Sequence, residues 1–177
     1  WKKHLKDYEI IEWNEKNFSI DYCRYTEEAY QRRKYAFVSD VARLYALKTY
    51  GGVYLDTDVE ILKDFTSELD ASEIFSFESD TLLMTGFMAA QKDSQVINEL
   101  LEAYLTRSFI NQDGSNDLTA NTVYVTEWHK ILEIFMCLII KHLALLTQII
   151  QALKLRRIHI WFITVWQLGE QVVLSYN

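Results

Sequence analysis

Residues 39–58 read SDVARLYALKTYGGVYLDTD and carry the clearest pattern in the chain. Apolar side chains at three-to-four-residue spacing predict a helix from Ser39, a candidate N-cap, to about Tyr50. The glycine pair that follows would end this helix, since glycine readily adopts the left-handed conformation of a helix stop. Val53–Asp56 is rich in β-branched and aromatic residues and predicts a buried strand directly after the turn. This segment therefore predicts a helix–turn–strand unit.

Predicted helices and strands alternate on both sides of this unit. The predicted strands are Tyr8–Trp13, Ile74–Phe77 and Met84–Ala90. The predicted helices are 26–34, with Thr26 as N-cap, and 94–105. Alternation of this kind is typical of the α/β class.

Length and charge limit the class of protein further. The chain has 177 residues, enough for one packed core and marginal for two domains. Its net charge of −7 argues against a protein that binds nucleic acid through phosphate contacts. Cys23 and Cys137 lie in no metal-binding spacing, so a zinc module is not indicated.

The composition changes abruptly after residue 127. Residues 1–127 contain 23 acidic and 13 basic side chains, whereas residues 128–177 contain 2 and 5, with no Asp or Pro. The apolar residues of this tail fall near helical spacing, so we expect it to be helical. Residues 131–150 have the length of a membrane span, but Glu133, Lys141 and His142 interrupt them. A membrane-surface or partner helix stays open as an alternative.

Asp56 and Asp58 are candidate metal ligands. If both lie on the strand, they point the same way, because side chains alternate faces with a period of two residues. Carboxylates suit a hard cation such as Mg²⁺ or Mn²⁺ that also binds phosphate oxygens. The end of a strand in an α/β sheet is also a common ligand site.

Three neighbours of this pair have two possible roles. Asp40 and Arg43 lie one helical turn apart and form either a surface ion pair or a site for an anion and sugar hydroxyls. Tyr54 is either a core aromatic or a ligand contact.

The order of helix, Gly-Gly, buried strand and Asp-x-Asp, with Asp40 and Arg43 before it, resembles the sugar-binding region of glycosyltransferase family 32. Members of that family include capsular-polysaccharide transferases and outer-chain mannosyltransferases. The resemblance extends over residues 1–127 and includes residues 8–14, 85–90 and 107–109. It implies a GT-A, Rossmann-like fold and a nucleotide-sugar transferase.

The resemblance also implies site residues. It implies that Asp56 and Asp58 are the catalytic pair and hold Mn²⁺ or Mg²⁺. The donor-binding residues that it implies are Asp40, Arg43, Gly52, Tyr54 and Asp56.

The chain departs from the family at both ends. The family's first strand is expected to be missing, which gives an incomplete core at 1–127 followed by an apolar tail at 128–177. A reading-frame error in the tail is one hypothesis, because back-translation of residues 158–168 in another frame permits the family's missing element.

These features predict a metal-dependent hexosyltransferase that uses a nucleotide diphosphate sugar and a glycan or lipid-linked acceptor. We expect a cytoplasmic protein with a possible membrane-surface attachment and no nucleic-acid partner. An inactive remnant and a membrane-attached scaffold stay open as alternatives.

Overall fold

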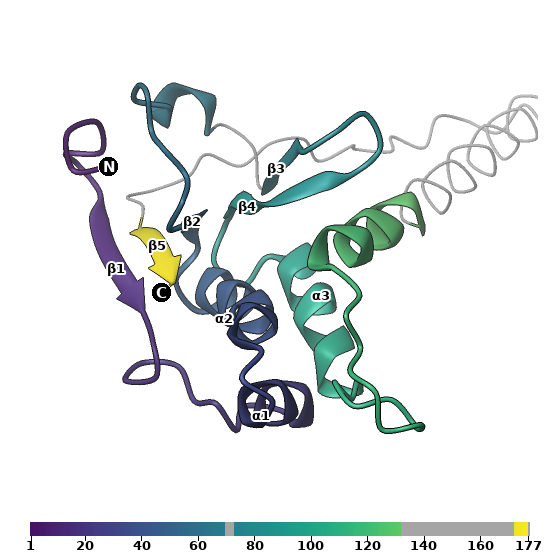
Figure 1. Ribbon diagram of the computed structural model, residues 1–177. Helices are drawn as coiled ribbons and strands as arrows, with labels where there is room; N and C mark the ends of the chain where they lie inside the picture. The colour runs from purple at the N-terminus through teal and green to yellow at the C-terminus, as the bar shows by residue number, and fades with distance from the viewer. Residues whose placement is uncertain (70–72, 132–171, 177) are drawn as a thin grey trace, which may run out of the picture.

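A mixed β-sheet with helices packed on one face organises the chain (Figure 1). The computed structural model describes residues 1–69, 73–131 and 172–176. The strands are β1 (Glu9–Trp13), β2 (Gly52–Asp56), β3 (Glu73–Phe77), β4 (Leu83–Ala90) and β5 (Val172–Tyr176). The helices are α1 (Arg24–Gln31), α2 (Tyr35–Tyr50), the 3₁₀ turn η1 (Thr66–Glu68) and α3 (Gln95–Leu105). The predicted α/β class is confirmed.

The strand order in the sheet is β1-β5-β2-β4-β3. The first three strands in this order run parallel, and β4 then pairs antiparallel with both β2 and β3. In the parallel part, the backbone of Tyr176 is in register with both Trp13 and Asp56. The carboxyl ends of these strands therefore meet at one edge of the sheet, which is where sheets of this type bind ligands.

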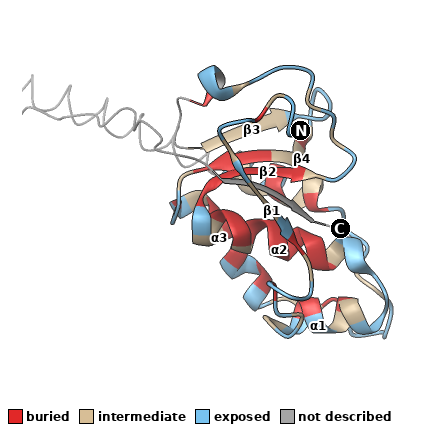
Figure 2. Ribbon diagram, turned by 90° about the vertical axis from the view of Figure 1, so that its left-hand side faces the viewer, coloured by how far each residue is buried: buried red, intermediate tan, exposed pale blue. Residues whose placement is uncertain are grey.

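Helix α2 lies against the sheet and forms the centre of the core. Its buried residues include Val38, Val41, Leu44 and Leu47, which follow the helical repeat. Figure 2 shows the buried residues gathered in α2, β2 and β4, with α1 farther from the sheet. Because α2 is held on its inner face, side chains on this helix have a fixed position relative to the end of β2.

Two predicted helix starts are wrong. Helix α2 begins at Tyr35, so Ser39 lies inside it, and its hydroxyl donates to the carbonyl of Ala36 at 2.7 Å. Helix α1 has Cys23 as N-cap, and Thr26 accepts a hydrogen bond from the Cys23 N–H at 3.1 Å. Ser and Thr side chains can bond the backbone at several positions of a first turn, so their presence alone does not fix the cap.

The tail contains a strand where the sequence pattern predicted only helix. The backbone of Val172–Tyr176 forms parallel strand pairs with β1 and β2. Its valines favour a strand, and its partner strands lie far away in the sequence. Residues 121–131 are helical, in agreement with the prediction for the start of the tail. Residues 132–171 lie outside the described residues. They include most of the candidate membrane segment and all of residues 158–168, on which the reading-frame hypothesis depends.

Among the described residues, no helix combines the length and apolar character that crossing a membrane requires.

Glu28 ties α1 to the loop that follows α3. One carboxylate oxygen accepts from the Arg24 Nε at 2.6 Å; the other accepts from the Ser108 hydroxyl at 2.6 Å and the Ile110 N–H at 3.0 Å. Burial opposes the charge of Glu28, but these hydrogen bonds outweigh it and lower the pKa of Glu28 to about 2.

Replacing Glu28 by Gln is expected to lower the free energy of unfolding by about 1–3 kcal/mol at pH 7. Because the folded-state pKa lies below the ordinary value, this stabilisation is present above about pH 4.5 and is lost as the pH falls toward 2. Urea unfolding at pH 7 and pH 3 measures it. Glu27→Gln, on the exposed side of α1, is the matched control. A Glu28→Gln loss that is equal at both pH values would contradict this assignment.

Candidate active site

A cavity of about 310 Å³ lies at the carboxyl end of β2. Helix α2 and the end of β2 supply its walls. Its lining residues are Tyr35, Ala36, Ser39, Arg43, Tyr54, Asp56, Thr57 and Asp58. Small-ligand pockets have volumes of about 300–1,000 Å³, so this cavity is large enough for a sugar-sized group.

Arg43 is the central charged group of this cavity. It is 5 % exposed, and its Nη2 lies 3.1 Å from Asp40 Oδ1 and 3.4 Å from Asp56 Oδ1. Its Nη1 donates to the Thr85 carbonyl at 2.7 Å. Burial opposes the charge, but Tyr54, Asp40 and Asp56 outweigh burial and raise the pKa of Arg43. The guanidinium therefore stays charged and holds two carboxylates that come from different elements.

Asp40 is buried beside Arg43, at 8 % exposure. The surface ion pair considered for Asp40 and Arg43 is therefore excluded. Burial raises the pKa of Asp40 to about 6, against the attraction of Arg43 and with the help of the charge on Asp56. In its ionised form, which Arg43 favours, the carboxylate accepts hydrogen bonds only.

Tyr54 is buried in the core and also contacts two residues of the site, Arg43 and Asp56. Its ring is 1 % exposed and lies under the Arg43 guanidinium, with 4.9 Å between Cζ and the ring centroid. Its hydroxyl donates to Asp56 Oδ1 at 2.6 Å. Burial raises the pKa of Tyr54, so the phenol keeps its proton and remains a donor. Tyr54 and Arg43 thus fix the same oxygen of Asp56.

Asp58 lies in a turn and not on the strand, so the predicted strand alternation is wrong for this residue. Strand β2 ends at Asp56, and the Val59 N–H donates to the Asp56 carbonyl at 3.0 Å, which closes a turn. The turn nevertheless brings Asp58 to the same cavity as Asp56. Asp58 is exposed, whereas Asp56 is half-buried.

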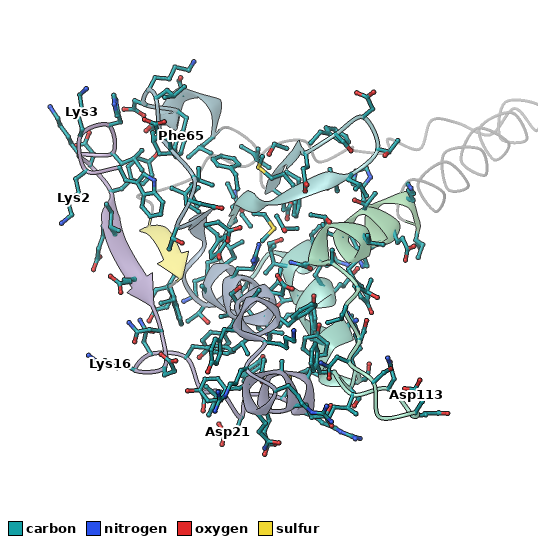
Figure 3. The ribbon with its side chains drawn as sticks, viewed as in Figure 1. Lys2, Lys3, Lys16, Asp21, Phe65 and Asp113 are labelled. Carbon is teal, nitrogen blue, oxygen red and sulfur yellow. The ribbon has the colours of Figure 1, made fainter. Side chains whose placement is uncertain are left out.

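A second cavity of about 490 Å³ is also lined by Asp58. It is formed by the N-terminal turn and the segment that follows β2, and it shares Thr57 and Asp58 with the first cavity. The Trp1 indole N–H donates to the Val59 carbonyl at 2.6 Å and joins these two segments. Figure 3 shows Lys3 on this turn, near the segment that carries Phe65. Asp58 is therefore accessible from both cavities.

Gly52 is not among the residues that line the cavity. It begins β2 with a φ of 93° and pairs with Ala90. A Cβ on its neighbour Gly51 would come within 2.5 Å of the Lys92 backbone nitrogen. The glycine pair therefore serves the turn into β2.

Several site residues were not predicted from the sequence. Tyr35 and Ser39 precede Arg43 by two turns and one turn of α2, so helical periodicity could have identified them. Thr85 and Gly86 come from β4, and no local signal connects them with Arg43 or Asp56. Asn121 and Tyr104 form a layer next to Asp40, in which the Tyr104 hydroxyl donates to Asn121 Oδ1 at 3.0 Å.

The carboxylates of Asp56 and Asp58 are suitable oxygen ligands for Mg²⁺ or Mn²⁺. Within residues 1–69, 73–131 and 172–176, no three His, Cys, Asp or Glu side chains lie close enough to form a complete metal site. Two protein carboxylates fit a cation that takes its remaining ligands from a bound phosphate and water.

Replacing Tyr54 by Phe is expected to keep the core packed and to weaken Mn²⁺-dependent binding of a nucleoside diphosphate about 10-fold, since ligand-orienting hydrogen bonds contribute effects of this size. Calorimetric titration of uridine and guanosine diphosphate measures it, with the melting temperature as a control for folding. Tyr124→Phe, whose ring packs near Tyr104, is the matched control. Unchanged binding in Tyr54→Phe would restrict Tyr54 to a packing role.

One comparison with known proteins gives a match, and it covers the segment that carries the Asp-x-Asp pair. Residues 1–78 match the family model described as "Glycosyltransferase sugar-binding region containing DXD motif". These residues include β1, α1, α2 and β2, and therefore Asp40, Arg43, Asp56 and Asp58. No curated protein and no solved structure matches the chain. Residues 1–78, less than half of the chain, are therefore similar to the sugar-binding region of glycosyltransferases.

Proposed function

We propose that this chain is a metal-dependent glycosyltransferase of the GT-A type that transfers a hexose from a nucleotide diphosphate sugar to a glycan or lipid-linked acceptor. One observation carries the proposal: the Asp-x-Asp carboxylates and Arg43, which are separate in sequence, line one cavity at the end of β2, and the buried Asp40 pairs with Arg43 at its wall. This cavity lies in the segment that matches the family model.

The donor's sugar would occupy the first cavity. Asp56 offers a carboxylate oxygen to sugar hydroxyls, and Ser39 adds a hydroxyl group at the cavity wall. The buried Asp40 would contribute through its ion pair with Arg43. Tyr35 is 47 % exposed at the start of α2 and lines the same cavity, so its ring is available to a sugar face. These groups would orient the sugar over Asp56.

The donor's diphosphate would lie at Asp58, which both cavities share. A bound Mg²⁺ or Mn²⁺ would supply charge neutralisation for the leaving diphosphate. Asp58 and Asp56 would hold this cation, and Asp58 is accessible because it lies in an exposed turn.

Arg43 would have two roles: it would hold the Asp56 carboxylate in position, and it would supply a positive charge at the cavity wall. Its terminal nitrogens already lie against Thr85, Asp40 and Asp56. The buried positive charge lies at the wall of the cavity, where it would stabilise negative charge that develops on the donor.

The proposal is tested by turnover. The chain is incubated with Mn²⁺ and with UDP-glucose, UDP-galactose or GDP-mannose, and release of nucleoside diphosphate by transfer of the sugar to water is measured. We expect release from at least one donor, and a decrease of about 100-fold in Asp56→Asn. Asp113→Asn should keep the wild-type rate, because Asp113 (Figure 3) is exposed and does not line the cavity. Absence of release from every donor, or full activity in Asp56→Asn, would reject the proposal.

A further inference from the structure

Two consecutive residues of β4 lie against the Arg43–Asp56 pair. The carbonyl oxygen of Thr85 accepts from Arg43 Nη1 at 2.7 Å. A Cβ placed on Gly86 would lie 3.0 Å from Asp56 Oδ2, closer than side-chain carbons normally approach. One residue therefore binds the guanidinium, and the next leaves room for the carboxylate. Both residues lie outside the segment that matches the family model.

We propose that Thr85-Gly86 is the positioning element of the site: it sets where the Asp56 carboxylate lies relative to Arg43 and the cavity. For catalysis this proposal rests on the proposed function, whereas the contact between Gly86 and Asp56 does not.

The two oxygens of Asp56 have different surroundings. Oδ1 accepts from the Tyr54 hydroxyl and faces Arg43, whereas Oδ2 is next to Gly86. The carboxylate is planar and rigid, so a group that displaces Oδ2 also moves Oδ1. A methyl group at position 86 would therefore disturb both contacts of Oδ1 and change the direction in which Asp56 faces a ligand.

Glycine is needed at position 86 for space and not for backbone conformation. The φ angles in the left-handed region belong to Gly51, Gly52 and Gly114 among the described glycines. Gly86 lies within β4, in the stretch between Met84 and Met88 where the register with β3 shifts. In a strand interior, Ala is normally more stabilising than Gly. Glycine at position 86 therefore lowers the stability of the strand, and it leaves the space that the Asp56 carboxylate occupies.

The distances define a double-mutant test. After Asp56→Ala, the carboxylate is removed, and the nearest remaining Asp56 atom is Cβ, which lies 3.7 Å from the added methyl group, an ordinary contact. We therefore expect Gly86→Ala to lower the melting temperature of the wild-type chain by a few degrees and to raise it in the Asp56→Ala chain. The control pair is Asp56→Ala with Met84→Leu, two residues earlier in β4, where the effects should add.

Binding supplies the second readout. Gly86→Ala should weaken Mn²⁺-dependent binding of UDP or GDP about 10-fold in the wild-type chain, because it moves a group that orients the ligand. In the Asp56→Ala chain the same change should have no further effect on binding.

The outcomes separate this proposal from the proposed function. Equal melting shifts of Gly86→Ala in the two backgrounds would overturn the positioning role, and so would wild-type affinity in a Gly86→Ala chain. If the wild-type chain binds no nucleotide, the proposed function fails, and the melting-temperature cycle alone decides whether Gly86 positions Asp56.

Discussion

Replacing Arg43 by Lys is expected to lower the rate of sugar transfer at least 100-fold, although the positive charge is kept. A lysine ammonium has no planar fork and cannot reach Thr85, Asp40 and Asp56 from one side chain. Asp56 would lose one of the two contacts that fix its Oδ1. The affinity for the bare nucleoside diphosphate should fall less than the rate, because that ligand lacks the sugar.

Steady-state kinetics with the active donor measures the rate effect, and titration of the bare nucleotide measures the affinity. Arg24→Lys is the matched control: Arg24 also pairs with a carboxylate, but its side chain is 71 % exposed, so we expect little change. A wild-type rate in Arg43→Lys would show that the fork geometry has no part in the reaction.

Replacing Asp58 by Asn is expected to remove most of the metal dependence of nucleotide binding, with a loss of about 10–100-fold in Mn²⁺ affinity. Asn keeps the size of the side chain and removes the charge. Because Asp58 is exposed, we expect the substitution to leave the stability of the fold nearly unchanged.

Glu60→Gln is a close control for this change. Glu60 and Asp58 are both exposed and both line the second cavity, but only Asp58 also lines the first. Titration of UDP or GDP with and without Mn²⁺ compares the two variants. Similar losses in both would place the cation in the second cavity and not between Asp56 and Asp58.

The helix–turn–strand unit could be predicted because its signals are local. Apolar spacing fixed α2 within four residues of its start, and the glycine pair marked the turn into β2. Asp56 was placed correctly for the same reason. The turn that displaces Asp58 from the strand could not be predicted, because nothing in Asp-Thr-Asp distinguishes the end of a strand from its continuation.

The pairing of β5 with β1 and β2 could not be predicted either. Its partners lie more than a hundred residues away in sequence, and strand pairing depends on contacts that a local pattern does not contain. The burial of Arg43 could not be predicted from the sequence either. An Asp and an Arg one helical turn apart give the same sequence pattern on a protein surface and in a core. The contribution of Thr85 and Gly86 depends on the antiparallel pairing of β2 with β4.

Calorimetric titration of the full-length chain with its donor sugar nucleotide, in Mn²⁺ and then in excess chelator, tests most directly whether the cavity at Asp56 and Asp58 is a metal-dependent donor site. We predict binding at least 10-fold tighter with Mn²⁺. Equal affinity in Mn²⁺ and in chelator would contradict this account.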